Sequence, residues 1–330
     1  MLRLPPFQYI APRTLDEAAR LLADYGEQAM PVAGGTDLYP NMKRRQFTPA
    51  VLVGLSGLRE LRGIAGDPGS GMTIGALTTL SEVASHPAIR EFYPALAQAA
   101  GMVSAPQLRN VGTLGGNLCV DTRCNYYNQT EFWRASIGYC MKKDGDICLV
   151  APGSPRCWAV SSSDCAPALI SLQARARLVG PRGDRVIPVA ALYRDDGMEY
   201  LAKERDEVLA EVLLPSAGGW RSVYRKLRRR GSFDFPILGV AVALREDASG
   251  MVLDARITLG AVASHPVEAG EAARLLEGQR LTPELIAAAA TLAARPAKPL
   301  DNADLTINYR KQMTPVYVRR ALEELQNSAP

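Results

Sequence analysis

The chain has 330 residues, of which 47% are hydrophobic and 22% are charged, and its formal net charge is +4. This length predicts two or three domains with a sizeable core, and the composition excludes disordered and fibrous proteins. Basic and acidic residues are interleaved except at Arg228-Arg229-Arg230, so nucleic-acid binding is not indicated. No apolar run approaches the ~20 residues of a membrane helix, and the first residues lack a signal-peptide core. We therefore expect a cytoplasmic protein without membrane contact.

The first part of the chain reads as helices that alternate with short strands. Thr14 and Glu17 form a capping-box pattern that opens a helix ending near Tyr25. A second capping-box pattern, at Thr79, opens a helix that stops before Pro87. The other expected elements are strands at 30–33, 50–55 and on both sides of a turn at 66–71, and helices at 38–43 and 93–103.

Residues 215–219, Pro-Ser-Ala-Gly-Gly, form the best candidate for a linker. Before it, sheet strands are expected at 174–179, 185–188 and 207–214. After it, the pattern predicts strands at 222–227, 237–244 and 253–262, and then helices at 267–276, 282–293 and 314–325. A run of strands followed by a run of helices is typical of a separate α+β domain. We therefore predict an α+β protein with domains at 1–216 and 217–330.

Two glycine-rich segments are candidates for phosphate binding. The first is Ala33-Gly34-Gly35-Thr36-Asp37-Leu38, which follows a strand; its glycines let backbone N–H groups converge, and its threonine adds a hydroxyl. The second, residues 107–117, interleaves Gly112, Gly115 and Gly116 with Thr113 and Asn117. Two such loops can face each other across a pyrophosphate. The alternative is two structural turns, because neither a dinucleotide fingerprint nor a Walker sequence is present.

All six cysteines lie between positions 119 and 165. In a reducing compartment, clustered cysteines are more typical of metal ligands or small buried residues than of disulfides. Packing does not explain the spacing C-x15-C-x7-C-x8-C in a polar, turn-rich segment. The four cysteines with this spacing are Cys124, Cys140, Cys148 and Cys157. The other two, Cys119 and Cys165, are expected to be small buried residues.

Four stretches resemble the FAD-binding motifs of the medium flavoprotein subunits in the molybdenum hydroxylase (xanthine dehydrogenase) family. They are residues 31–38, Ile74-Gly75-Ala76, residues 107–118 and residues 163–169. The resemblance covers most of the chain and implies a two-subdomain FAD-binding domain followed by a C-terminal α+β domain. The FAD contacts that it implies are Pro31, Val32, Ala33, Gly34, Gly35, Thr36, Asp37, Leu38, Asn110, Val111, Gly112, Thr113, Leu114, Gly115, Gly116, Asn117, Asp164 and Lys226. By residue type alone, Asp164 also suits a helix N-cap and Lys226 a solvated strand position.

Most members of this family pass almost directly from the Gly-Gly-Asn loop to the Ser-Asp motif, whereas residues 118–162 intervene here. The insertion, at about 119–160, resembles that of 4-hydroxybenzoyl-CoA reductase β subunits, which holds a 4Fe-4S cluster. The resemblance implies that the four spaced cysteines ligate such a cluster. Glycines and prolines supply turns between them, and Lys142, Lys143 and Arg156 can offset the cluster's negative charge. A structural zinc site is the alternative, although zinc cysteines are normally paired as C-x2-4-C.

The resemblance implies an electron-transfer subunit that holds FAD and a 4Fe-4S cluster inside a larger molybdenum enzyme. The implied partners are a molybdenum-cofactor large subunit, a 2Fe-2S small subunit and a ferredoxin-type electron donor, in a dimer of heterotrimers. The implied reaction is the reductive dehydroxylation of 4-hydroxybenzoyl-CoA to benzoyl-CoA in anaerobic aromatic degradation. The sequence contains no catalytic triad or nucleophile elbow, so substrate chemistry is expected on a partner subunit.

Two other functions are compatible with the same residues. One is the flavoprotein subunit of a molybdenum hydroxylase that oxidises a heterocycle or an aldehyde, with electrons flowing outward. The other is a zinc-stabilised flavin-binding module without a redox role. The metal content separates this last function from the first, because only a cluster brings iron and sulfide.

Overall fold

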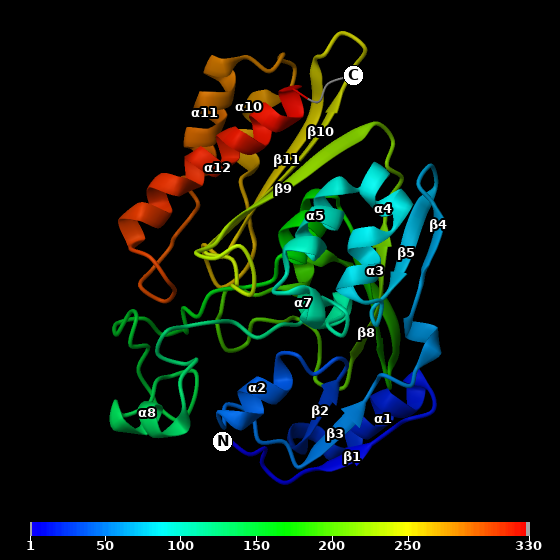
Figure 1. The fold of residues 1–330 in the computed structure, drawn as a ribbon, viewed down its shortest axis with the longest axis vertical. Helices are drawn as coiled ribbons and strands as arrows, with labels where there is room; N and C mark the ends of the chain where they lie inside the picture. The colour runs from blue at the N-terminus through cyan, green and yellow to red at the C-terminus, as the bar shows by residue number, and fades with distance from the viewer. Residues whose placement is uncertain (1, 328–330) are drawn as a thin grey trace.

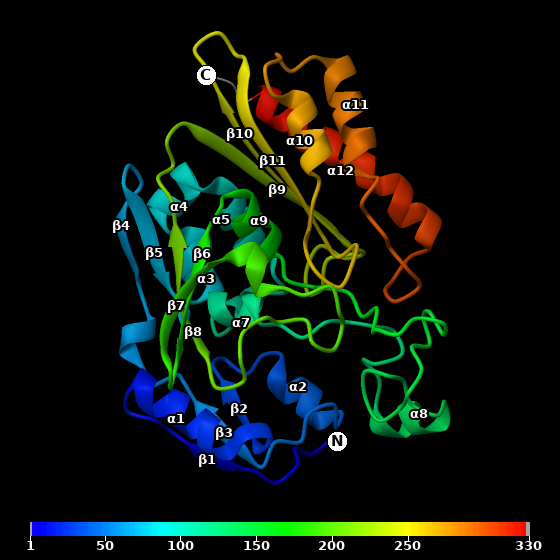
Figure 2. The ribbon, with the colours of Figure 1, turned by 180° about the vertical axis from the view of Figure 1, so that it is seen from behind.

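The computed structural model describes residues 2–327, which form three β-sheets arranged along one long axis (Figure 1). The N-terminal sheet lies at one end, the C-terminal sheet and its helices lie at the other, and a five-stranded sheet lies between them, as Figure 2 shows from behind. The segment that carries the cysteines projects sideways around α8 (Figure 1). This mixture of sheets and helices confirms the predicted α+β class.

The N-terminal sheet is parallel, with the strand order β1-β3-β2. Its strands are β1 (Gln8–Ile10), β2 (Ala29–Val32) and β3 (Val51–Gly54), and its helices are α1 (Leu15–Tyr25) and α2 (Leu38–Lys43). Strand β3 is central and buried throughout, in agreement with its uninterrupted apolar sequence. Thr14 caps α1 by accepting from the Glu17 N–H (3.2 Å). Glu17 accepts from the Arg13 N–H (2.7 Å), not from Thr14, so only half of the predicted capping box forms.

The middle sheet is antiparallel, with the strand order β4-β5-β8-β6-β7. Its strands are β4 (Ile64–Asp67), β5 (Gly71–Gly75), β6 (Arg175–Gly180), β7 (Gly183–Pro188) and β8 (Val208–Leu214). The helices of this part of the chain are α3 (Leu80–Ser85), α4 (Pro87–Phe92), α5 (Pro94–Met102), α6 (Pro106–Arg109), α7 (Leu114–Leu118) and α9 (Cys165–Ser171). The capping box of Thr79 and Glu82 forms in full and confirms the predicted start of α3.

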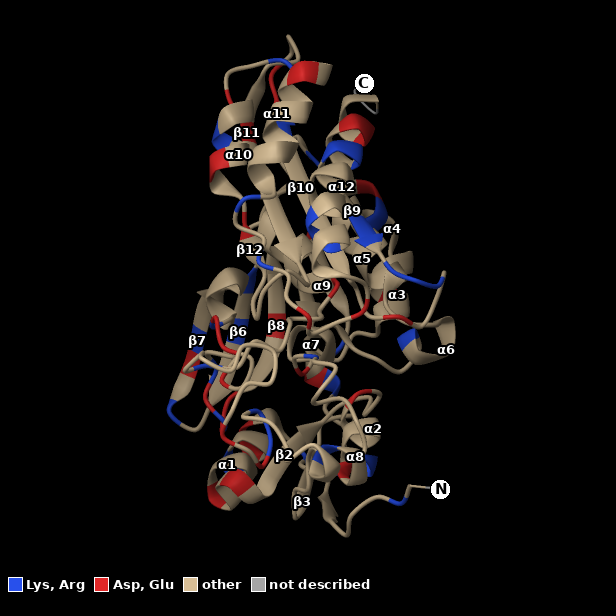
Figure 3. Ribbon diagram, turned by 90° about the vertical axis from the view of Figure 1, so that its left-hand side faces the viewer, with Lys and Arg blue, Asp and Glu red and all other residues tan. Residues whose placement is uncertain are grey.

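The C-terminal sheet is antiparallel, with the strand order β12-β11-β10-β9. Its strands are β9 (Trp220–Leu227), β10 (Leu238–Glu246), β11 (Val252–Gly260) and β12 (Val267–Glu268), and its helices are α10 (Gly270–Leu276), α11 (Pro283–Ala293) and α12 (Ile307–Asn327). One face packs against α10 and α12, and the other packs against α5 and α9, so β10 is buried from Leu238 to Leu244. Figure 3 shows the body of β10 free of charged residues.

Two helices of this domain differ from their predicted bounds. Residues 267–268 form β12, because Val267 pairs with Leu259, and the helix begins only at Gly270. Helix α12 begins at Ile307 rather than at 314 and continues through Pro315. The proline removes one N–H from the helix, and the carbonyl that loses this donor belongs to Lys311, an exposed residue.

Between α7 and α9 the chain forms the predicted insertion, in which residues 131–136 fold as helix α8 (Glu131–Ser136) and turns predominate elsewhere. Single-turn 3-10 helices lie at Gly26–Gln28, Arg59–Leu61 and Val189–Leu192. Helices long and apolar enough to span a membrane are absent from residues 2–327.

Arg310, in the first turn of α12, holds three parts of the C-terminal domain together. Its side chain is 1% exposed, and burial lowers its pKa to about 10, so it is charged at neutral pH. The guanidinium donates to Leu300 O (2.7 Å), Asn302 Oδ1 (3.2 Å) and Ala261 O (2.7 Å).

Replacing Arg310 with Met should lower the free energy of unfolding by about 3 kcal/mol, because buried acceptors lose a charged donor. The matched control is Arg319→Met on the same helix, where the exposed pair with Glu323 (3.6 Å) contributes less than about 0.5 kcal/mol. Urea unfolding followed by circular dichroism measures both variants. Equal loss of stability in the two would contradict the role of Arg310.

Candidate cofactor sites

The two glycine-rich segments lie against each other, one after β2 and the other between α6 and α7. A Cβ atom added to Gly34 would lie 2.1 Å from Val111 O, so a larger residue does not fit at this position. A Cβ on Gly112 would lie 3.4 Å from Thr36 Oγ1. Gly35 has a φ of +68° and packs against the Tyr39 ring, as only glycine readily does. The expected meeting of the two segments is confirmed.

A cavity of about 280 Å³ opens where the two segments meet. It is lined by Tyr9, Val32, Ala33, Gly34, Tyr39, Ser56, Arg62, Leu77, Thr79, Asn110, Val111 and Thr113. Six of the residues predicted to contact FAD are therefore at the cavity: Val32 at the end of β2, two from the first segment and three from the second. Backbone groups, hydroxyls and one guanidinium surround it, which suits a phosphorylated ligand.

Half of the residues that line the cavity were not predicted from the sequence. Tyr9, Tyr39, Ser56, Arg62, Leu77 and Thr79 come from several separate segments and belong to no glycine motif. The sequence did mark Thr79 as the N-cap residue of a helix through its capping box. In the fold, this helix start lies beside the second glycine segment. A bridge between Thr79 and Thr113 makes that contact. Arg62 carried no signal, because it lies in a mixed charged stretch, Leu58-Arg59-Glu60-Leu61-Arg62, of a kind common on protein surfaces.

The rest of the second segment builds the scaffold and does not line the cavity. A Cβ on Gly115 would lie 2.7 Å from the Ala76 Cβ, so this glycine lets α7 pack closely on the end of β5. Asn117 Oδ1 accepts from Ser163 Oγ (2.8 Å) and from the Cys165 N–H (3.1 Å). The Gly-Gly-Asn and Ser-Asp motifs, 46 positions apart at Asn117 and Ser163, thus form one junction. A direct FAD contact by Leu114, Gly115, Gly116 or Asn117 stays a prediction, as it does for Pro31, Gly35, Thr36, Asp37, Leu38 and Gly112.

Asp164 and Lys226 form a buried ion pair (2.8 Å) between the FAD-binding domain and the C-terminal sheet. The Tyr224 hydroxyl donates to Asp164 Oδ1 (2.7 Å), and Lys226 Nζ donates to Met102 O (3.1 Å). Burial raises the pKa of Asp164, and the charge of Lys226 opposes this change. The alternative reading of Lys226 as a solvated strand residue is wrong, and its predicted contact with FAD stays a prediction.

The expectation that the Asp164 side chain caps a helix is also wrong. Asp164 occupies the N-cap position of α9 but makes no capping hydrogen bond. Ser163 Oγ accepts from the Ala166 N–H (3.0 Å) instead. The carboxylate turns to the Lys226 ammonium because a buried charge gains more from a buried counter-charge than from one backbone N–H.

Four cysteines of the insertion line one pocket. Cys124, Cys140, Cys148 and Cys157 are each at most 8% exposed. The other lining residues are Tyr126, Tyr127, Met141, Lys142, Leu149, Val150 and Ala159. Neither Cys119 nor Cys165 is part of this pocket, and Cys165 is fully buried as expected. The spacing that set four cysteines apart in the sequence thus corresponds to one place in the fold.

The pocket does not have the geometry of a single-ion site. Within the described residues, no three Cys, His, Asp or Glu side chains are grouped closely enough to hold one metal ion. Zinc would need sulfur atoms about 3.8 Å apart, given Zn–S bonds of about 2.3 Å. The cavity between the four thiols is small, about 10 Å³. The thiols are therefore enclosed by side chains but not drawn together around one ion.

Burial raises the pKa of Cys124 to about 12 and that of Cys157 to about 11. The Ala159 N–H donates to Cys157 Sγ (3.3 Å), and this bond, followed by the charge of Lys142, acts in the opposite direction. At neutral pH these two thiols are protonated unless a positively charged group binds them.

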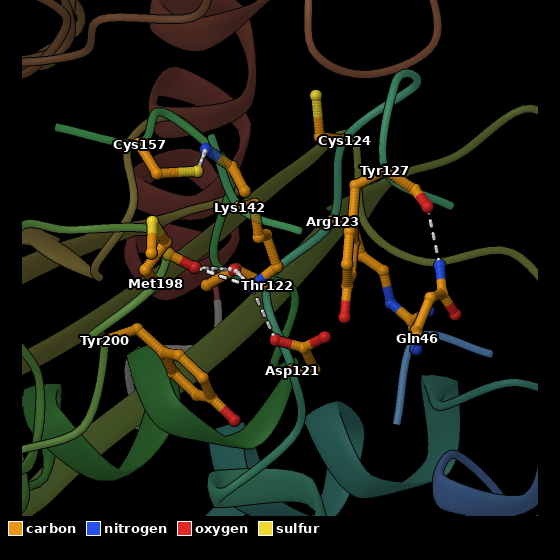
Figure 4. Close-up of polar contacts among 12 residues, drawn as sticks. Gln46, Asp121, Thr122, Arg123, Cys124, Tyr127, Lys142, Cys157, Met198 and Tyr200 are labelled. Carbon is orange, nitrogen blue, oxygen red and sulfur yellow. Dashed lines mark hydrogen bonds and ion pairs between the residues drawn. The ribbon is translucent and has the colours of Figure 1, made fainter. Parts of the chain in front are cut away.

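Arg123 connects the cysteine pocket to the first glycine segment. It precedes Cys124, its guanidinium forms an ion pair with Asp37, and it lies 4.2 Å from the centroid of the Phe235 ring. Burial lowers the pKa of Arg123 to about 10, so the charge persists at neutral pH. Gln46, which follows α2, links the insertion to the N-terminal part of the chain, since its Nε2 donates to Tyr127 O (2.6 Å), as Figure 4 shows.

Comparison with known proteins places this architecture in a family. Residues 5–217 match the FAD binding domain in molybdopterin dehydrogenase, and residues 222–325 match the CO dehydrogenase flavoprotein C-terminal domain. The chain is 32% identical to the carbon monoxide dehydrogenase medium chain of Hydrogenophaga pseudoflava, over 96% of each chain. It is 34% identical to the aldehyde oxidoreductase FAD-binding subunit of Escherichia coli, over 81% of this chain and 85% of that one. The structure of reconstituted CO dehydrogenase from Oligotropha carboxidovorans has a TM-score of 0.81 at 28% identity, covering 99% of this chain and 100% of that chain.

The fold and the paired glycine segments are those of an FAD-binding flavoprotein. The chain belongs to the molybdenum hydroxylase family, as a medium FAD-binding subunit of the kind found in carbon monoxide and aldehyde dehydrogenases. The predicted family, the FAD-binding domain with its C-terminal α+β domain, and FAD as a cofactor are thereby confirmed.

Gly34→Ala should weaken FAD binding at least about tenfold, because the new Cβ meets Val111 O and overpacking costs about 1–3 kcal/mol. Gly57→Ala is the matched control, since a Cβ there has open space around it. Fluorescence titration of the deflavinated protein with FAD gives both dissociation constants. Unchanged affinity in the Gly34 variant would show that the meeting of the two segments does not form the flavin site.

Proposed function

We propose that this chain carries a 4Fe-4S cluster beside FAD and serves as the electron-transfer subunit of a molybdenum enzyme. The observation that supports the cluster is the convergence of Cys124, Cys140, Cys148 and Cys157 on one pocket. When bound, FAD exchanges two electrons and a cluster exchanges one at a time. The protein's part is to hold both groups and to set their potentials.

The donor set fits such a cluster better than it fits zinc. A cubane cluster is held by four thiolates, and its four irons and four sulfides keep those ligands farther apart than zinc does. The lining supplies four cysteines, no carboxylate and no histidine, and the apolar side chains of Met141, Leu149 and Val150 cover it. These features support a cluster and give no support to the zinc-stabilised module.

The relatives named above are a medium chain and an FAD-binding subunit, which are parts of larger enzymes. The proposed partners are accordingly a molybdenum-cofactor large subunit and a 2Fe-2S small subunit. A ferredoxin-type donor, a dimer of heterotrimers, a cytoplasmic location and the boundary at residues 216 and 217 stay predictions.

Two substrates are candidates for the assembled enzyme. The four-cysteine insertion supports reductive dehydroxylation of 4-hydroxybenzoyl-CoA. The names of the relatives, a carbon monoxide dehydrogenase and an aldehyde oxidoreductase, support the oxidative alternative better than they support the reductase. The insertion remains the one feature that favours the reductive reaction, since it is the part of this chain that resembles the reductase subunits.

The two candidates give opposite results in one pair of assays on the purified complex. With 4-hydroxybenzoyl-CoA and a low-potential donor, the reductase forms benzoyl-CoA. With aldehydes or purines and an artificial acceptor, the hydroxylase reduces the acceptor. Absence of benzoyl-CoA in the first assay would eliminate the reductase, whatever the second assay gives.

Cys140→Ser should remove about four irons per copy of this chain and the broad visible absorption of the cluster, while FAD stays bound. Cys119→Ser is the matched control, because Cys119 lies in the same stretch of chain but outside the pocket. Iron, acid-labile sulfide and FAD are measured on each purified complex. Unchanged iron in the Cys140 variant would refute the cluster, and equal loss of FAD would make the insertion a structural element.

A further inference from the structure

Lys142 carries a charge that is buried beside the cysteine pocket. Its side chain is 6% exposed, and the residue is part of the pocket lining. Its ammonium donates to Asp121 Oδ1 (2.7 Å), Thr122 Oγ1 (2.7 Å) and Gly197 O (2.6 Å), and Figure 4 shows it joined to the first two. An ammonium has three N–H donors, so all of them are engaged. The position of this charge is therefore fixed by the fold.

Asp121 supplies the counter-charge from outside the pocket. Its side chain is 4% exposed and is not part of the pocket lining. The Lys142 ammonium lies 4.7 Å from the centroid of the Tyr127 ring and 5.5 Å from that of Tyr200. Of the pair, only Lys142 lines the pocket, and its charge acts on Cys157. The pair is thus an oriented dipole, with Lys142 the nearer of the two charges to the thiols.

We infer that Lys142 and Asp121 tune the reduction potential of the bound cluster in opposite directions. This inference rests on the proposed function. Reduction adds negative charge to the cluster, so a fixed cation nearby stabilises the reduced form and a fixed anion destabilises it. Low exposure matters, because water and salt screen a buried charge far less than a surface charge.

The other two basic residues that the sequence placed near the cluster are held elsewhere. Lys143 is 33% exposed and pairs with Asp144 (3.2 Å). Arg156 pairs with Asp195 (2.8 Å) and lies 3.7 Å from the centroid of the Trp158 ring. Neither residue is part of the pocket lining. Lys143 is therefore a matched control, since it has the same charge one position along the chain.

The test is a redox titration of the purified complex, followed by the electron paramagnetic resonance signal of the reduced cluster. Lys142→Gln should lower the midpoint potential and Asp121→Asn should raise it. We expect about a tenfold change in the reduction equilibrium for each, or about 59 mV for one electron. Lys143→Gln should leave the midpoint close to that of the unchanged chain. Lys142→Arg keeps the charge, so its midpoint potential should stay close to that of the unchanged chain.

Iron content is measured in parallel, because it separates this inference from the proposed function. If the unchanged complex lacks the cluster signal, the proposed function fails. If the signal is present and Lys142→Gln moves the midpoint no more than Lys143→Gln, the inference is overturned while the cluster stands. If Lys142→Gln loses iron, its midpoint potential cannot be measured and the Asp121→Asn variant is used instead. A raised midpoint potential in Asp121→Asn supports the inference, and an unchanged or lowered one overturns it.

Discussion

The structure depends on a junction that holds the two ends of the insertion together. Asn117, the last residue of the second glycine segment, accepts hydrogen bonds from Ser163 and from the first N–H of α9. Six residues further into the insertion, the backbone of Arg123 pairs with that of Val160 through two hydrogen bonds (2.8 and 2.7 Å). Because the entropy of closing a loop grows slowly with its length, the chain between these contacts can be long at small cost. The scaffold can therefore carry the cysteine segment at a small entropic cost.

The same junction explains the composition of the second glycine segment. Its first half, around Asn110 and Val111, contacts Gly34 and lines the cavity, and its second half forms α7. Gly115 lets α7 approach Ala76 closely, and Asn117 then reaches the start of α9. A motif that looks like a single loop in the sequence thus has one half that lines the cavity and one half that packs in the framework. The distinction is invisible in the sequence, because glycine serves close packing and close approach to a ligand equally well.

Local patterns predicted most elements, and long-range contacts account for the differences. The start of α3 followed from Thr79 and Glu82, which cap the helix by themselves. The pairing of Val267 with Leu259 creates β12, a contact that no local pattern contains. Helix α12 extends through Pro315 because the rest of its inner face packs on the C-terminal sheet, which outweighs one missing hydrogen bond.

The candidate sites were predictable to different degrees for the same reason. Thiols spaced along one segment pointed to one site because few other arrangements explain them, and the pocket brings them together. Arg62 and Tyr9 reach the cavity between the two glycine segments from distant segments, where no motif marks them. Asp164 was placed correctly at the start of α9, but its partner depends on how the C-terminal sheet docks. The docking of the sheet depends on long-range contacts, and the residue type at one position does not determine it.

Contacts with other parts of the chain also hold the insertion in place. They fix the cysteine pocket relative to the cavity between the two glycine segments. Arg123 of the insertion forms an ion pair with Asp37 in the first glycine segment. Asn302 of the C-terminal domain donates to Trp158 O (2.5 Å). Asn302 O in turn accepts from the Asn125 N–H (3.0 Å). Contacts with both domains on either side of Cys124 leave the pocket little freedom to move. For the proposed cluster, such a fixed geometry would suit electron transfer, because two groups held by one rigid chain need no docking step before they exchange charge.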